Sequence, residues 1–214
     1  MVTDSRLYGT HVDDDSVESR CAGVAAAAGR AARAGVTLIQ IRERSLEAAS
    51  LLDLAGRVRR AIDGTPARML INDRVDVALG VGADGVHLPA SAPGCARVRE
   101  IVPESFLIGR SVHSQAEAVA VADSGGCDYL VFGTVFPSRS KPSDHPVAGL
   151  DTLARVCRSV SLPVLAIGGI TTDRIAEVAE AGAAGIAAIG LFALGAQDEL
   201  DDRVARIHRA FDRT

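Results

Sequence analysis

The chain has 214 residues, 48% hydrophobic and 23% charged, so it is long enough to bury a sizeable core without disulfides or a structural metal. Its 23 basic and 27 acidic residues give a net charge of −4, which argues against a nucleic-acid binder. No apolar run approaches the roughly 18 residues of a membrane span. The polar residues 1–10 do not resemble a secretory signal, so we expect a cytoplasmic protein.

Short apolar segments rich in β-branched residues alternate along the chain with Ala-rich amphipathic segments, a pattern that predicts strands alternating with helices. Ser45 is the expected N-cap of one helix, and Ser114 with Glu117 resembles a capping box that opens another. In chain order the predicted strands and the helices that follow them are 1–4 with 17–34, 36–41 with 45–62, 68–72 with 75–79, 85–88 with a helix after Pro93, 106–113 with 114–123, 128–132 with no helix assigned, 163–167 with 172–181, and 185–189 with 200–211.

The predicted strands are nearly continuous apolar runs, which is typical of parallel strands buried on both faces. Seven clear units, together with an eighth strand that must lie near residues 1–4, predict an α/β protein that folds as a single (β/α)8 TIM barrel over residues 1–214. A doubly wound open sheet is the alternative architecture.

Polar side chains gather at the carboxyl ends of the predicted strands, where a barrel carries its site. Gln40 and Arg42 lie two residues apart and should project to the same side of their strand. A barrel interior would bring Arg42 together with Asn72 and His113.

Glycines after the last two predicted strands indicate a phosphate site, because their amides can approach an anion closely. These are Gly168 and Gly169, and then Gly190 after Ile189. The long polar loop that follows the strand 128–132 carries Lys141 and predicts a lid over an anionic substrate. A dinucleotide-binding glycine motif is missing from the sequence, so a nicotinamide cofactor is not expected.

Taken in order over residues 36–192, several motifs resemble the thiamine-phosphate synthase/TenI superfamily of small (β/α)8 barrels. The matching segments are 40–44 (QIRER), 71–79 (INDRVDVAL), 84–88 (DGVHL), 109–114 (GRSVHS), 128–133 (DYLVFG), Lys141 and 167–170 (IGGI).

The resemblance implies one of two activities. Synthases of this superfamily join a pyrimidine pyrophosphate to a thiazole phosphate with Mg²⁺, whereas TenI-type tautomerases aromatise a thiazole carboxylate phosphate without metal. The synthase pattern has an Asn-Asp-Asp triplet and a further Mg²⁺-binding Asp, but this chain has Asn72-Asp73-Arg74 and, at the second place, Ala92. Loss of a carboxylate should weaken binding of a hard cation, so we expect a thiazole tautomerase, an isomerase with no metal.

Tautomerisation needs a group that is both base and acid near neutral pH, and His113 is the expected catalytic residue. The guanidinium of Arg42 suits the substrate carboxylate. The resemblance implies further substrate contacts from Gln40, Arg44, Asn72, Ser111 and Lys141, with the phosphate held by the backbones of Gly168, Gly169, Ile189 and Gly190.

Three alternatives remain open from the sequence. The first is a Mg²⁺-dependent thiamine-phosphate synthase, in which Asp73 would bind the metal. The second is a non-catalytic regulator that binds a thiazole or thiamine phosphate. The third is a Schiff-base lyase that uses Lys141, the single lysine of the chain. The expected partner is a small phosphorylated thiazole, without nucleic acid or membrane, and a homo-oligomer is compatible with the sequence.

Overall fold

The computed structural model describes residues 1–8, 16–138, 142, 144–193 and 195–212, and the chain divides into two compact units. The first unit contains Met1–Val86 and Ile189–Ala205, and the second contains His87–Ala188 and Arg206–Thr214. The described residues form a seven-stranded sheet whose order, β1 to β7, follows the chain. This confirms the α/β class and parallel strands, whereas the predicted strand 1–4 is not formed as a strand.

In the first unit, β1 (Leu38–Ile41) pairs in parallel with β2 (Arg68–Asn72), and β3 (Gly85–Leu88) begins there. The predicted strand 1–4 is reduced to a single parallel bridge between Val2 and Gln40. The reason lies in Asp4, whose carboxylate accepts the backbone N–H of Arg6 and so caps the 3-10 helix η1 (Ser5–Leu7). The extended backbone therefore ends at Asp4.

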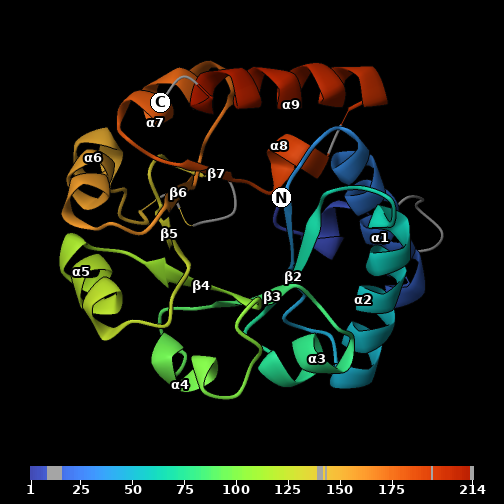
Figure 1. Cartoon of the computed structure of the whole chain (residues 1–214). Helices are drawn as coiled ribbons and strands as arrows, with labels where there is room; N and C mark the ends of the chain where they lie inside the picture. The colour runs from blue at the N-terminus through green and yellow to red at the C-terminus, as the bar shows by residue number, and fades with distance from the viewer. Residues whose placement is uncertain (9–15, 139–141, 143, 194, 213–214) are drawn as a thin grey trace. The chain divides into compact units, whose positions relative to one another are not determined.

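Two long helices pack side by side in this unit, α1 (Val17–Arg33) and α2 (Ala48–Ile62), as Figure 1 shows. Their close approach depends on Gly29, because a Cβ there would lie 2.9 Å from the carbonyl oxygen of Ala61. The predicted cap at Ser45 is wrong, since α2 begins after Glu47, which makes no side-chain cap bond. Shorter helices are α3 (Val75–Gly80) and α8 (Gly190–Ala193), and the last helix is α9 (Gln197–Phe211).

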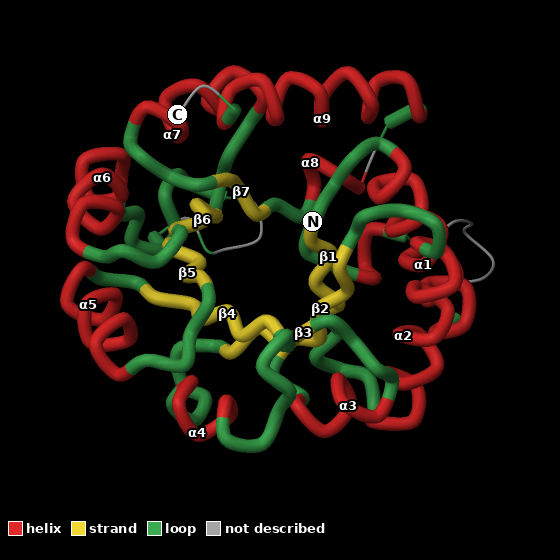
Figure 2. The backbone as a smooth tube through the Cα atoms, in the orientation of Figure 1, coloured by secondary structure: helices red, strands yellow, loops and turns green. Residues whose placement is uncertain are grey.

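In the second unit, four parallel strands lie side by side (Figure 2). They are β4 (Leu107–Val112), β5 (Tyr129–Phe132), β6 (Val164–Ile167) and β7 (Gly185–Ala187). Helices pack against these strands: α4 (Cys95–Arg99) and α5 (Gln115–Ser124) on β4, α6 (Gly149–Ser159) on β6, and α7 (Ile175–Glu180), which follows η2 (Thr172–Arg174), on β7.

The sequence prediction missed α6, which lies between the long loop and β6. The signal was present, because Leu150, Leu153 and Val156 recur three residues apart, and the last two are fully buried. The start is irregular, with Gly149 at a φ of 74° and no side-chain cap bond before it.

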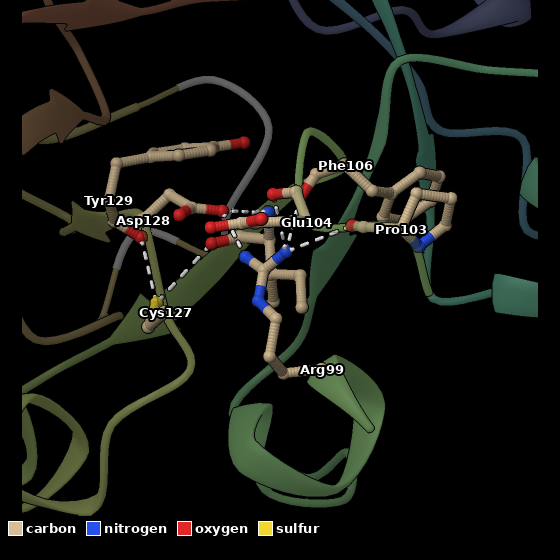
Figure 3. A network of polar contacts seen from close by, with 8 residues as sticks. Arg99, Pro103, Glu104, Phe106, Cys127, Asp128 and Tyr129 are labelled. Carbon is tan, nitrogen blue, oxygen red and sulfur yellow. Dashed lines mark hydrogen bonds and ion pairs between the residues drawn. The ribbon is translucent and has the colours of Figure 1, made fainter. Parts of the chain in front are cut away.

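A polar network fixes the amino ends of β4 and β5 (Figure 3). One carboxylate oxygen of Asp128 accepts the guanidinium of Arg99 at 2.6 Å and the backbone N–H of Ile108 at 2.7 Å. Arg99 also donates to three carbonyls of the turn that leads into β4, those of Pro103, Glu104 and Phe106. In the first unit Asp84 similarly accepts the N–H of Met69 at 2.7 Å. Each aspartate thus holds the neighbouring strand in register.

Strand residues contribute to the core of each unit. Those that are fully buried in the first unit include Ile39, Met69, Ile71 and Val86, and in the second unit Ile108, Leu130, Phe132 and Ala166.

Within the described residues no helix combines the length and apolar character needed to cross a lipid bilayer.

Candidate active site

At the carboxyl ends of β1 and β2, Gln40 and Asn72 form a polar pair. The Nε2 of Gln40, a side chain only 7% exposed, donates to the Oδ1 of Asn72 at 3.0 Å. Because the amide oxygen of Asn72 is thus occupied, its amide nitrogen remains as a donor for a ligand. The structure therefore brings together two residues that the sequence analysis assigned to substrate binding.

Arg42 follows β1 with a half-buried guanidinium for which no described residue is an acceptor. The carboxylate of its neighbour Glu43 is instead bonded to the first residues of the chain, where its oxygens accept the hydroxyl of Thr3 at 2.6 Å and the N–H of Ser5 at 3.0 Å. Burial, and then the charge of exposed Arg44, lowers the pKa of Arg42. The charges of Asp4 and Glu43 act in the opposite direction. A partly desolvated guanidinium that forms no hydrogen bond to a carboxylate of the described residues is suited to an anionic ligand.

Asp73 lies directly after β2 with its carboxylate exposed and a φ of 67°, the only positive value at a non-glycine residue in the described part of the chain. Such a conformation is uncommon and is often found at functional positions. Arg74, by contrast, is turned toward Asp76 through two hydrogen bonds of 2.8 and 2.6 Å. That bidentate pair lowers the pKa of Asp76 to about 2.

His87, Ser111 and Tyr129 form a chain of contacts across β3, β4 and β5. The Nε2 of His87 lies 2.8 Å from the Oγ of Ser111, and its Nδ1 lies 3.3 Å from the phenol oxygen of Tyr129. His87 and Tyr129 are buried, whereas Ser111 is half-buried. Burial raises the pKa of Tyr129, so its phenol is neutral at any physiological pH.

His113, the predicted acid/base residue, is exposed and anchored at one nitrogen. Its Nδ1 lies 2.6 Å from the carbonyl oxygen of Gly133, which can only accept, so Nδ1 carries the proton and Nε2 is left as the reactive nitrogen. The predicted cap at Ser114 is confirmed, because its hydroxyl accepts the N–H of Glu117 at 3.1 Å. The Glu117 carboxylate in turn accepts the backbone N–H of His113 at 2.6 Å.

Gly168 and Gly169 follow β6 with φ values of 104° and 62°. Both glycines pack closely against the segment that follows β5. A Cβ on Gly168 would lie 2.5 Å from Cγ2 of Thr134, and a Cβ on Gly169 would lie 2.2 Å from the carbonyl oxygen of Pro137. Within the described residues no acceptor is found for either amide. Two successive amides of this kind can hold a phosphate oxygen.

The predicted site residues are divided between the two units. Ile189 and Gly190 belong to the first unit, where Gly190 is the first residue of α8. Lys141 lies outside the described residues. Gln40, Arg42 and Asn72 belong to the first unit, and His113, Ser111 and the Gly168–Gly169 pair to the second. Their roles stay predictions.

Sequence reasoning missed several polar residues that shape these surroundings. Tyr129 was counted only as a strand residue, and Glu43 only as part of a motif. Arg110, 9% exposed, donates to the carbonyls of Pro93, Ala90 and Ala92 at 2.6, 2.8 and 2.9 Å, and so holds the loop after β3. A buried arginine inside a strand is the signal that could have revealed it.

Comparison with known proteins gives consistent matches. A family model described as thiamine monophosphate synthase matches residues 13–192. The chain is 43% identical over 148 residues to the thiamine-phosphate synthase of Methanoculleus marisnigri, covering 69% of this chain and 70% of that protein. It is 34% identical over 178 residues to the thiamine-phosphate synthase of Ruminiclostridium cellulolyticum, covering 83% and 79%.

Among solved structures, the thiamine phosphate pyrophosphorylase from Pyrococcus furiosus is similar with a TM-score of 0.76 and 31% identity, covering 99% of this chain and 94% of that one. A 3-hexulose-6-phosphate synthase, at 18% identity and a TM-score of 0.67, shares the fold alone.

These relatives overturn the predicted thiazole tautomerase. Sequences 34–43% identical to this chain are named thiamine-phosphate synthase, so the comparisons point to a transferase and not to an isomerase. The prediction gave weight to Arg74 as a departure from the synthase triplet. In the structure the Arg74 guanidinium is bound to Asp76.

Proposed function

Because the chain belongs to the thiamine monophosphate synthase family, we propose that it is a thiamine-phosphate synthase, which joins a pyrimidine pyrophosphate to a thiazole phosphate. A ring nitrogen of the thiazole forms a bond to the carbon that carries the pyrophosphate, and the carbon–oxygen bond to pyrophosphate breaks. Family membership is the observation that carries the proposal. The half-buried Arg42 guanidinium, which has no hydrogen-bond acceptor among the described residues, supports it.

Both substrates in this proposal are anions, and each unit offers groups suited to anions. In the first unit Arg42 would bind a phosphate oxygen, with the amide nitrogen of Asn72 oriented by Gln40 as a second donor. In the second unit the hydroxyl of Ser111 and the amides of Gly168 and Gly169 would supply neutral donors. Such contacts hold the leaving group and the nucleophile in place, which accounts for much of the rate enhancement of a bimolecular reaction.

The residues fit a magnesium ion that arrives with pyrophosphate, and they do not fit a site built by the protein alone. No group of three or more His, Cys, Asp or Glu side chains in the described residues could hold a metal ion. Mg²⁺ is commonly bound by one or two carboxylates together with substrate phosphates, and the exposed carboxylate of Asp73 can supply one. When bound, the ion would neutralise charge on the departing pyrophosphate.

We also keep the closed eight-stranded barrel and the single domain as proposals. The parallel bridge between Val2 and Gln40 supports an eighth strand beside β1.

The direct test incubates the purified chain with Mg²⁺, the pyrimidine pyrophosphate and the thiazole phosphate, and measures thiamine phosphate and released pyrophosphate. We expect the two products in equal amounts, with turnover abolished by a chelator. A folded protein that forms no thiamine phosphate under these conditions would refute the proposal.

A further inference from the structure

The second unit contains a buried relay that ends on a half-buried hydroxyl. Tyr129, His87 and Ser111 come from three neighbouring strands and are joined by contacts of 3.3 and 2.8 Å. Only Ser111, at the outer end, is partly exposed. The relay thus has one end that a ligand can reach.

The fit of the tyrosine ring shows that this arrangement is built into the strands. Gly109 lies opposite Tyr129 in the β4–β5 register, and a Cβ on Gly109 would lie 2.1 Å from Cζ of the ring. The ring therefore occupies space that only a glycine leaves open. Its hydroxyl is directed by this packing toward His87, 42 residues earlier in the chain.

The direction of the hydrogen bonds that His87 forms with Ser111 and Tyr129 depends on whether Ser111 donates its proton to the ligand. An imidazole that carries a single N–H has one lone pair, on its other ring nitrogen. If Ser111 is to donate to a phosphate oxygen, which only accepts, then its own oxygen must receive the N–H of His87 at Nε2. The Nδ1 lone pair must then accept the hydroxyl proton of Tyr129, which burial keeps on the phenol.

We propose that Tyr129 and His87 are positioning residues, which fix the hydroxyl proton of Ser111 outward so that Ser111 donates to the pyrophosphate group of the substrate. This inference rests on the proposed synthase function for the identity of the ligand. It assigns to Tyr129 and His87 an effect on binding that acts only through Ser111.

The chain offers a matched control for removal of the tyrosine hydroxyl. Tyr8 is as buried as Tyr129, each 7% exposed. Its hydroxyl, however, has no hydrogen-bond partner in the described part of the chain. Tyr129→Phe and Tyr8→Phe therefore delete the same atom. The first variant removes a hydroxyl that contacts His87, and the second removes a hydroxyl outside the relay.

The first test is spectroscopic and needs no variant. Two-bond ¹H–¹⁵N correlation spectra of the ¹⁵N-histidine-labelled full chain at pH 8.5 report which nitrogen of each imidazole carries the proton. We expect His87 to be protonated at Nε2 and His113, which donates to the Gly133 carbonyl, at Nδ1. A His87 protonated at Nδ1 would mean that the relay runs the other way and would overturn the inference.

The second test titrates inorganic pyrophosphate into each protein by calorimetry and measures KM for both substrates. Tyr129→Phe should weaken pyrophosphate binding and raise KM for the pyrimidine pyrophosphate about 3–10-fold, the range of one net hydrogen bond. KM for the thiazole phosphate should not change, and Tyr8→Phe should change neither value. In a Ser111→Ala background, Tyr129→Phe should have no further effect.

The outcomes separate this inference from the proposed function. Suppose that the wild-type chain makes thiamine phosphate. If Tyr129→Phe then binds pyrophosphate normally, or if it weakens pyrophosphate binding equally in the Ser111→Ala background, the relay is overturned and the synthase function stands. A wild-type chain that makes no thiamine phosphate refutes the synthase. If the wild-type chain does not bind pyrophosphate, the proposal that Ser111 donates to a pyrophosphate group is overturned.

Discussion

Replacement of Arg42 by methionine should weaken substrate binding and stabilise the free protein at the same time. The guanidinium is half-buried, lacks an acceptor in the described residues, and has its pKa lowered first by burial. Its charge is therefore a cost to the folded chain until an anion arrives. Methionine keeps the length and the apolar stem of the side chain and removes only the charge.

Both magnitudes follow from this geometry. Desolvation of a fully buried polar group costs about 1–3 kcal/mol; for a half-buried guanidinium whose charge Asp4 and Glu43 partly offset, we take about 1 kcal/mol. For a chain of this size that corresponds to a rise in Tm of about 2–4 °C for Arg42→Met. A charge-assisted hydrogen bond to phosphate contributes about 1.5–3 kcal/mol, so KM for the pyrimidine pyrophosphate should rise about 10–100-fold.

The assay pairs thermal unfolding without ligand with steady-state kinetics. Arg57→Met is the control, because Arg57 already pairs with Glu18 and Asp53 at the surface and such pairs contribute about 0–1 kcal/mol. That variant should leave KM unchanged. If Arg42→Met lowers Tm and leaves KM unchanged, Arg42 is a structural residue and the reasoning fails.

Three further outcomes are expected. Arg110→Met should destabilise the protein by about 3 kcal/mol, because three carbonyls lose a charged donor, and thermal unfolding should show Tm lower by about 6–12 °C. Asp76 should titrate near pH 2 in carboxyl NMR spectra, and Arg74→Met should return its pKa toward the ordinary value of 3.8. Because the folded-state pKa is depressed, the stabilisation from this pair is present above about pH 4 and is lost as the pH falls toward 2. Asp73→Asn should raise the Mg²⁺ concentration for half-maximal synthase activity by about tenfold or more, since even indirect partners of a metal contribute that much.

Each of these outcomes can fail in a defined way. A Tm change below about 2 °C for Arg110→Met would mean that water replaces the guanidinium at the three carbonyls. An Asp76 carboxyl that titrates identically with and without Arg74 would show that the bidentate pair does not form in solution. Asn tolerates the positive φ of position 73, so an unchanged Mg²⁺ dependence in a folded Asp73→Asn variant would remove that carboxylate from the metal.

The strands were predictable because burial on both faces leaves a plain signal. β2 and β3 have the predicted bounds, and the other five strands lie within the predicted segments. The failures occur where local side-chain chemistry overrides the pattern. Asp4 ends the first extended segment by capping a turn, and α2 begins at Ala48 without the expected serine cap.

The candidate site was visible in part. Gln40 and Asn72 could be predicted to lie together because they end neighbouring parallel strands. Tyr129 could not be assigned to the site, since its hydroxyl reaches His87 only through a space opened by a glycine on another strand. Sequence spacing contains no record of such a contact. The choice between synthase and tautomerase failed for a similar reason, because a changed residue such as Arg74 says nothing until its own partner is known.

The polar residues near the strand ends differ in how much hydrogen-bonding capacity the chain itself leaves unused. Glu43 and Arg110 have theirs filled by neighbouring hydroxyl and backbone groups, so they hold loops in place. Among the described residues, Arg42, the outer side of Ser111 and the two amides of Gly168 and Gly169 keep theirs, and each of these groups can donate. In either unit, unused donors have most to gain from ligands that only accept. Phosphate and pyrophosphate oxygens are ligands of that kind, which is why the proposed substrates suit the residues that the fold leaves unsatisfied.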